Sequence, residues 1–164
     1  MRLSYVFSFI LLFSFFISAA EFSELFSADE LQIDADELSH DLASGDVFAT
    51  GNVVVTYGLI QLRASKASIN QQTYDFTAQG DAQNEVNISI AEQGSWSAPA
   101  VQGNFQKRSV AFGPFRLNSE IWHAAGESGI TDESGKKVLQ KAWLSTCDLE
   151  HPHYRIEAKE IVHH

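Results

Sequence analysis

The segment from Leu144 to Ile161, LSTCDLEHPHYRIEAKEI, holds the residue types of this chain that are best suited to metal or redox chemistry. Cys147, His151 and His153 follow a C-x3-H-x-H spacing, which could present one thiolate and two imidazoles to zinc. A closed zinc site also needs a fourth ligand, and the strong zinc motifs pair two ligand halves, so we expect no metal here. As the only cysteine of the chain, Cys147 either pairs with a cysteine elsewhere or is a free thiol packed at the start of a strand.

The sequence offers no convergent set of catalytic residues. It contains no G-x-S-x-G nucleophile elbow, and His40 and His123 have no evident base or nucleophile beside them. Asp34 and Asp36 could in principle serve glycoside hydrolysis, but on a strand they share an outward face, where solvation alone explains them. We therefore expect no catalytic residues, no cofactor and no enzyme.

Three tryptophans could stack on sugars, as in a carbohydrate-binding module. Trp143 begins an alternating strand, which favours packing into a core. For Trp96, which lies in a Gly/Ser-rich stretch, packing and sugar stacking are equally consistent with the sequence.

Residues 1–20 have the pattern of a secretory signal peptide. Arg2 is followed by the apolar run VFSFILLFSFFI and then by the small residues Ser18, Ala19 and Ala20. The apolar run is shorter than the roughly 20 residues that span a bilayer, so we expect cleavage after Ala20 and export of residues 21–164. The net charge of −10 and the scattered lysines do not favour nucleic-acid binding.

The rest of the chain alternates apolar and polar residues, which is typical of strands with one buried face. Examples are LQIDAD, DVFATGNVVVTY, IQLRAS and VNISI, whereas the single helical candidate, Ser23–Leu31, is short. In the less regular middle, Pro114 limits its segment to an edge strand or a break. The pattern predicts an all-β fold.

The strands repeat with a period of 29 residues, the spacing of Ala35 and Ala64 and of Gly51 and Gly80. The predicted units span about 31–58 and 60–90, and a third begins near residue 154, where YRIEAKEI matches LQIDADEL. Repeats of this length indicate stacked units that cannot each bury their own apolar face. Each unit reads as a strand, a tight turn and a returning strand, so we expect stacked hairpins in a coiled sheet or an open roll.

Two segments resemble the periplasmic region of the outer-membrane lipopolysaccharide assembly proteins, the LptD or OstA group. The first is ADELSHDLASGDVFATGNVVVTYGLIQLRASKASI, and the second is STCDLEHPHYRIEAKEI. The repeat is shared with the bridge protein LptA and with LptC, whereas the segment around Cys147 indicates the LptD branch. The resemblance implies an OstA-type twisted, V-shaped β-jelly roll with an apolar interior on the periplasmic side of the bacterial outer membrane.

The same resemblance implies transport of lipopolysaccharide, with the lipid portion held in an apolar groove and passed toward the outer membrane. The implied partners are lipopolysaccharide, an LptA-like bridge protein, and an outer-membrane barrel or lipoprotein; Cys147 would form a disulfide with a cysteine outside this chain. The period-two pattern assigns a set of small, branched and aromatic residues to the groove. These candidates are Ile33, Ala35, Val53, Val55, Leu62, Ala64, Phe76 and Ala78.

LptD-type proteins carry a large C-terminal barrel, whereas this sequence stops at His164, inside the expected third unit. We therefore expect a fragment, a truncated product or a chain that pairs with another, because a strand without a return partner leaves an open edge. Two alternatives remain at this point. One is a free-standing LptA-like periplasmic bridge protein, and the other is a secreted polysaccharide-binding or structural β-repeat protein.

Overall fold

The computed structural model describes residues 30–91, 94–147 and 152–163. The predicted signal peptide lies outside these ranges, as does the helical candidate Ser23–Leu31 up to its last two residues, of which Leu31 begins the first strand. All regular secondary structure in the described part consists of β-strands. This part contains no helix that is long and apolar enough to cross a bilayer. The prediction of an all-β fold is confirmed.

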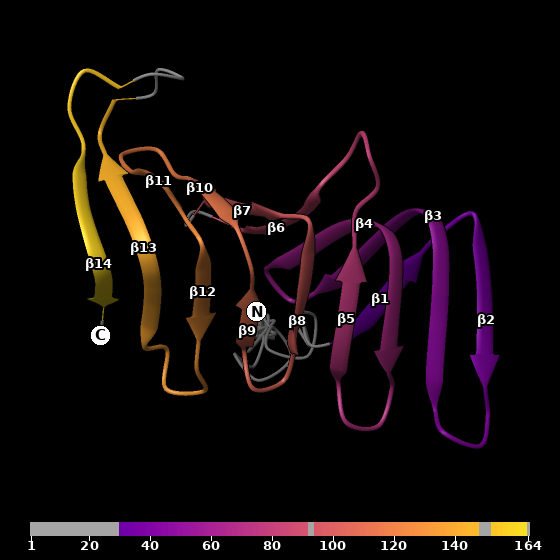
Figure 1. Ribbon diagram of the computed structural model, residues 1–164. Coiled ribbons are helices and arrows are strands. Elements are labelled where there is room, and N and C mark those ends of the chain that lie inside the picture. Colours follow the sequence, from indigo (N-terminus) through magenta and orange to yellow (C-terminus); the bar gives the residue numbers. More distant parts are fainter. Residues whose placement is uncertain (1–29, 92–93, 148–151, 164) are drawn as a thin grey trace, which may run out of the picture.

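In the described ranges, fourteen strands make up one antiparallel sheet, shown in Figure 1. The first seven are β1 (Leu31–Asp34), β2 (Glu37–Asp41), β3 (Asp46–Tyr57), β4 (Ile60–Asn70), β5 (Asp75–Gln79), β6 (Val86–Ile90) and β7 (Gly94–Ala98). The other seven are β8 (Ala100–Asn104), β9 (Ser109–Phe112), β10 (Phe115–Asn118), β11 (His123–Gly126), β12 (Ser128–Thr131), β13 (Lys137–Ser145) and β14 (Ile156–His163).

The strand pairing is that of a meander whose strands are bent in the middle. The long strand β3 pairs with β2 through its first half and with β1 through its second half. In the same way β4 pairs with β6 and then β5, and β13 pairs with β12 and then β11. The sheet is thereby divided into a first arm (β2, β5, β8, β9, β12) and a second arm (β1, β6, β7, β10, β11), and β3, β4, β13 and β14 run through both.

Small and conformationally restricted residues lie along the crease between the arms. In β3, Gly51 (φ +74°) and Asn52 (φ +46°) form a bulge, at which the register with β4 shifts. A bulge bends its strand and increases the local twist. Pro99 separates β7 from β8, and Pro114 lies in the break between β9 and β10, which agrees with one of the two readings of that segment.

The crease folds the two arms over a common apolar core. Its fully buried members include Val53, Val55, Leu62 and Ile69 of β3 and β4, and Val86 of β6. Ring contacts join the arms directly, as between Trp96 of β7 and Phe112 of β9, whose ring centroids are 5.3 Å apart. The result is a twisted, rolled sheet with its apolar residues inside, as the jelly-roll prediction expected.

The repeated residues of the first two predicted units occupy equivalent places at the crease. Ala35 lies between β1 and β2, and Ala64 lies where β4 exchanges β6 for β5. Gly51 lies in the bulge of β3, and Gly80 follows β5 directly. The 29-residue period therefore corresponds to two successive strands of the roll, each of which bends at the crease. The repeated alanine lies at the bend of one strand and the repeated glycine at the bend of the next.

Candidate functional site

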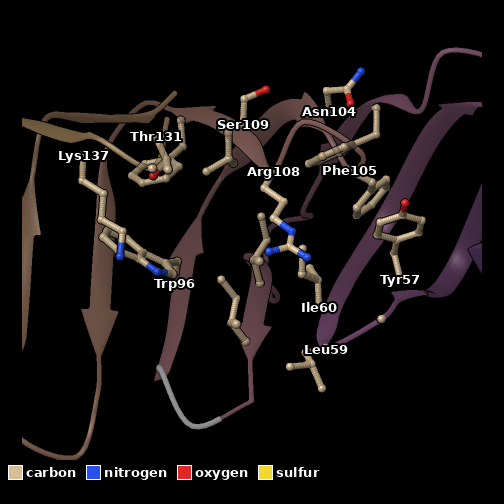
Figure 2. A pocket seen from close by; sticks show the side chains of 17 residues that line it. Tyr57, Leu59, Ile60, Trp96, Asn104, Phe105, Arg108, Ser109, Thr131 and Lys137 are labelled. Atoms are coloured by element: carbon tan, nitrogen blue, oxygen red, sulfur yellow. The ribbon is translucent and has the colours of Figure 1, made fainter. Parts of the chain in front are cut away.

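A cleft of about 460 Å³ lies between the strand ends of the two arms (Figure 2). The second arm contributes the turn after β3 and parts of β6 and β7. The first arm contributes β9 and the turns after β8 and β12. The lining residues are Tyr57, Gly58, Leu59, Ile60, Phe76, Ile88, Ile90, Trp96, Asn104, Phe105, Arg108, Ser109, Val110, Phe112, Thr131, Gly135 and Lys137.

Aromatic rings form much of the wall and close one side of the cleft. Phe105 stacks on Phe76 with their centroids 4.2 Å apart, and its ring is 5.9 Å from that of Tyr57. Tyr57, at the end of β3, also lies 5.7 Å from Tyr74, which belongs to the turn between β4 and β5. These rings connect the tips of the two arms at this side, and the cleft extends from them toward Trp96.

The turn between β8 and β9 is held by the buried side chain of Asn104. Its Nδ2 donates to the Thr73 carbonyl (2.8 Å) and to Oδ1 of Asp75 (2.7 Å), and its Oδ1 accepts from the Lys107 amide (2.9 Å). The hydrogen bond from Asn104 favours the carboxylate and lowers the pKa of Asp75 below its ordinary value. The turn is therefore rigidly attached to the neighbouring turn after β4.

The turn between β12 and β13 is organised by Asp132. Its Oδ1 accepts hydrogen bonds from the Ser134 hydroxyl (2.6 Å) and from the amides of Ser134 and Lys136, and the hydroxyl is the main cause of the lowered pKa of Asp132. Glu133 reaches the neighbouring turn, where its carboxylate lies 2.8 Å from Nζ of Lys107. This hydrogen-bonded pair raises the pKa of Lys107 and links the two turns that border the cleft.

The groove candidates from the sequence all lie in or against the core. Val53, Val55, Leu62, Phe76 and Ala78 are buried, whereas Ile33, Ala35 and Ala64 are partly buried and pack against the buried set. Among these eight, Phe76 is the one that lines the cleft. Their role in lipid binding stays a prediction, and the other seven candidates pack in or against the core without lining the cleft.

Sequence reasoning missed most of the cleft lining. Ile60, Ile88 and Ile90 belong to the alternating faces that were recognised, so the pattern contained a signal for them. Phe105 and Phe112 lie in the middle of the chain, where the repeat is faint. Only the tertiary structure places both at the cleft and brings Phe112 against Trp96. Trp96 itself packs against the core and also lines the cleft, which combines packing with an exposed ring face.

Cys147 is a partly exposed free thiol two residues after the end of β13. Its Sγ lies 3.8 Å from Nδ1 of His153, and its amide donates to Oγ of the buried Ser145 (3.0 Å). Within the described ranges no group of three metal-ligating side chains occurs, and His151 lies outside those ranges. A disulfide between Cys147 and another chain stays a prediction.

Comparison with known proteins places these features in a family. The family model described as LptA/(LptD N-terminal domain) LPS transport protein matches residues 32–164. The crystal structure of LptH, the LptA homologous periplasmic component of the conserved lipopolysaccharide transport device from Pseudomonas aeruginosa, is similar, with a TM-score of 0.57 and 15% sequence identity. That match covers 80% of this chain and 97% of LptH, and at this identity it shows the fold. Among curated proteins no sequence matches the chain.

Proposed function

The chain belongs to the family of LptA and LptD N-terminal domain lipopolysaccharide transport proteins, and from this premise we propose that its cleft carries the lipid portion of lipopolysaccharide on the periplasmic side of the outer membrane. It would receive the lipid from a bridge of similar rolls and pass it on toward an outer-membrane partner. Proteins of this family act in transport rather than catalysis, and we propose the same for this chain.

The observation that carries the proposal is the chemistry of the cleft. Aromatic and aliphatic side chains, including Ile60, Trp96, Val110 and Phe112, line an open space that the core does not fill. Acyl chains leave water for such a surface at a gain of about 25 cal/mol for each Å² of apolar area buried. Passing from one apolar cleft to another of similar character then changes the free energy little, so transfer can proceed in either direction until another step drives it.

The edge strands support contact with neighbouring rolls. Within the described residues, β14 pairs only with β13, and β1 and β2 pair only with β3, so both ends of the sheet present unpaired edges (Figure 1). Apolar side chains continue onto these edges. Leu38 of β2, opposite the buried Ala49, is 54% exposed, and Ile156 of β14, opposite Leu144, is 60% exposed. Such edges favour the addition of a partner strand.

An LptD-type domain and an LptA-like bridge differ in the partner that one edge of the sheet would contact: an outer-membrane protein for the former, another roll for the latter. We favour the LptD-type role, because the segment around Cys147 resembles that branch and its thiol is partly exposed for a cysteine of a partner. An LptA-like bridge would use both edges for other rolls, and trapping of Cys147 in a mixed disulfide with an outer-membrane protein would separate the two roles.

Photo-crosslinking in cells tests the carrier function with adjacent positions of β4. A photoreactive residue at Ile60, which lines the cleft, should capture lipopolysaccharide, whereas the same residue at Gln61, on the opposite face, should not. Leu62, which is 1% exposed and does not line the cleft, shows how much capture occurs at a packed inward position. Equal capture at Ile60 and Gln61, or no capture at either, would show that the cleft does not hold the lipid.

A further inference from the structure

Two cationic side chains, Arg108 and Lys137, lie on the first-arm rim of the cleft. Arg108 ends the turn after β8, and Lys137 begins β13 after the neighbouring turn. Figure 2 shows both side chains pointing from these strand ends into the cleft. Their placement stands out because the chain as a whole has a net charge of −10, yet no aspartate or glutamate is among the described residues that line this cleft.

The acidic residues near this rim already have other partners. Glu133 pairs with Lys107, Asp132 accepts the hydrogen bonds of its own turn, and Asp75 accepts from Asn104. Within the described ranges, neither Arg108 nor Lys137 has a carboxylate at ion-pair distance. The rim therefore presents two positive charges, beside an apolar surface, that the protein itself does not neutralise.

The backbone at Arg108 carries strain that a glycine would avoid. Its φ is +53°, in the left-handed region, and its amide closes the turn onto the Phe105 carbonyl at 3.2 Å. A residue with a side chain at this angle is uncommon, and such outliers concentrate at functional sites. At this position the chain carries a guanidinium that points into the cleft, whereas glycine would offer no charge there.

We propose that Arg108 and Lys137 bind the phosphate groups of the lipid whose acyl chains occupy the cleft, and that they thereby orient it with its headgroup at this rim. The proposal rests on the carrier function proposed above and adds to it the recognition of phosphate. A guanidinium offers paired N–H donors that match phosphate oxygens, and an ammonium contributes a compact charge. The rim would thus select a phosphorylated lipid over an uncharged one with the same acyl chains.

Binding of lipopolysaccharide and of a chemically dephosphorylated preparation of it to the purified protein tests this selection. We expect the unaltered protein to bind the phosphorylated form about tenfold more tightly, an effect that rising salt reduces. The double variant Arg108→Gln, Lys137→Gln should bind both forms with equal affinity. A matched control, Arg63→Gln, Lys66→Gln, removes the same charge from exposed positions of β4 that do not line the cleft and should retain the tenfold preference.

The outcomes separate this proposal from the carrier function. If the unaltered protein binds both preparations equally, the phosphate recognition is wrong while the carrier function stands. Loss of the preference in the control pair as well would also overturn it, because a general effect of charge would then suffice. Binding of neither preparation would contradict the carrier function and the proposal together.

Discussion

At the scale of single residues, the bend in β3 depends on Gly51. Its φ of +74° lies in the left-handed region, and a Cβ added there would come within 2.4 Å of Oδ2 of Asp36. Asp36 in turn accepts a hydrogen bond of 2.9 Å from Nδ2 of Asn52, the second residue of the bulge. The corner where β3 passes from one arm to the other therefore has no room for a side chain at this position.

Replacing Gly51 with alanine should lower the free energy of unfolding by about 1–3 kcal/mol, because the new methyl group adds a steric clash to an unfavourable backbone angle. Urea denaturation of the purified protein measures the change. Gly113→Ala is the matched control, since a Cβ there would have no atom within 4 Å and its φ is not in the left-handed region. Equal losses in the two variants would show that the geometry of the bulge is unimportant for stability.

At the scale of elements, β14 differs from the interior strands because it is paired along one side only in the described part. It pairs with nearly the whole length of β13, from Lys137 opposite His163 to Leu144 opposite Ile156. Its inward residue Ile161 packs against the core, whereas Ile156 is 60% exposed. The strand thus extends the apolar face of the sheet to an edge that another strand could cover.

The purified protein should self-associate, or bind a strand of a partner, through this edge. Sedimentation velocity at rising concentration should show association, and Ile156→Lys should weaken it, because a charge on the inner face of an edge strand opposes pairing. Ile130→Lys is the control, since Ile130 is similarly exposed but lies on the interior strand β12. A strict monomer at high concentration, with no partner captured from a periplasmic extract, would contradict the prediction.

At the scale of the whole molecule, the cleft exists because the bent strands hold two arms together at the crease and apart at part of their tips. On one side the tips meet through Tyr57, Tyr74 and Phe105, and beyond these rings the space remains open to Trp96. A ligand seated there contacts both arms at once. It should therefore stabilise the fold as a unit.

Saturating lipopolysaccharide should raise the melting temperature, since a ligand at 100 times its Kd adds about 2.7 kcal/mol to the free energy of unfolding. Ile60→Asp, which places a charge in the cleft wall, should abolish the rise, because an unpaired charge disfavours apolar contact. Gln61→Asp, on the outer face of the same strand, should preserve it. Thermal melts with and without lipid measure both, and identical responses of the two variants would place the lipid elsewhere.

The fold class, the family and the inner faces of the repeat strands could all be predicted from the amino-acid sequence. Alternation along β3 and β4 sufficed for this, because a period of two leaves each residue only one of two faces, and Val53, Val55 and Leu62 are indeed buried. The crease was also encoded, through the repeated Ala35, Gly51, Ala64 and Gly80. These are local properties, because they depend on the sequence of each strand and not on the strands that pair with it.

Which inward residues line open space and which fill the core could not be predicted without the folded structure. The alternation assigns both Val55 of β3 and Ile60 of β4 to the inner face, yet Val55 is fully buried while Ile60 borders the cleft. The difference arises because the arms are farther apart toward their tips. The rim was equally hidden, since Arg108 and Lys137 are 29 residues apart and meet one cleft only after β8, β9, β12 and β13 have paired. Faces follow from local periodicity, whereas a cavity depends on how far apart two folded surfaces come to lie.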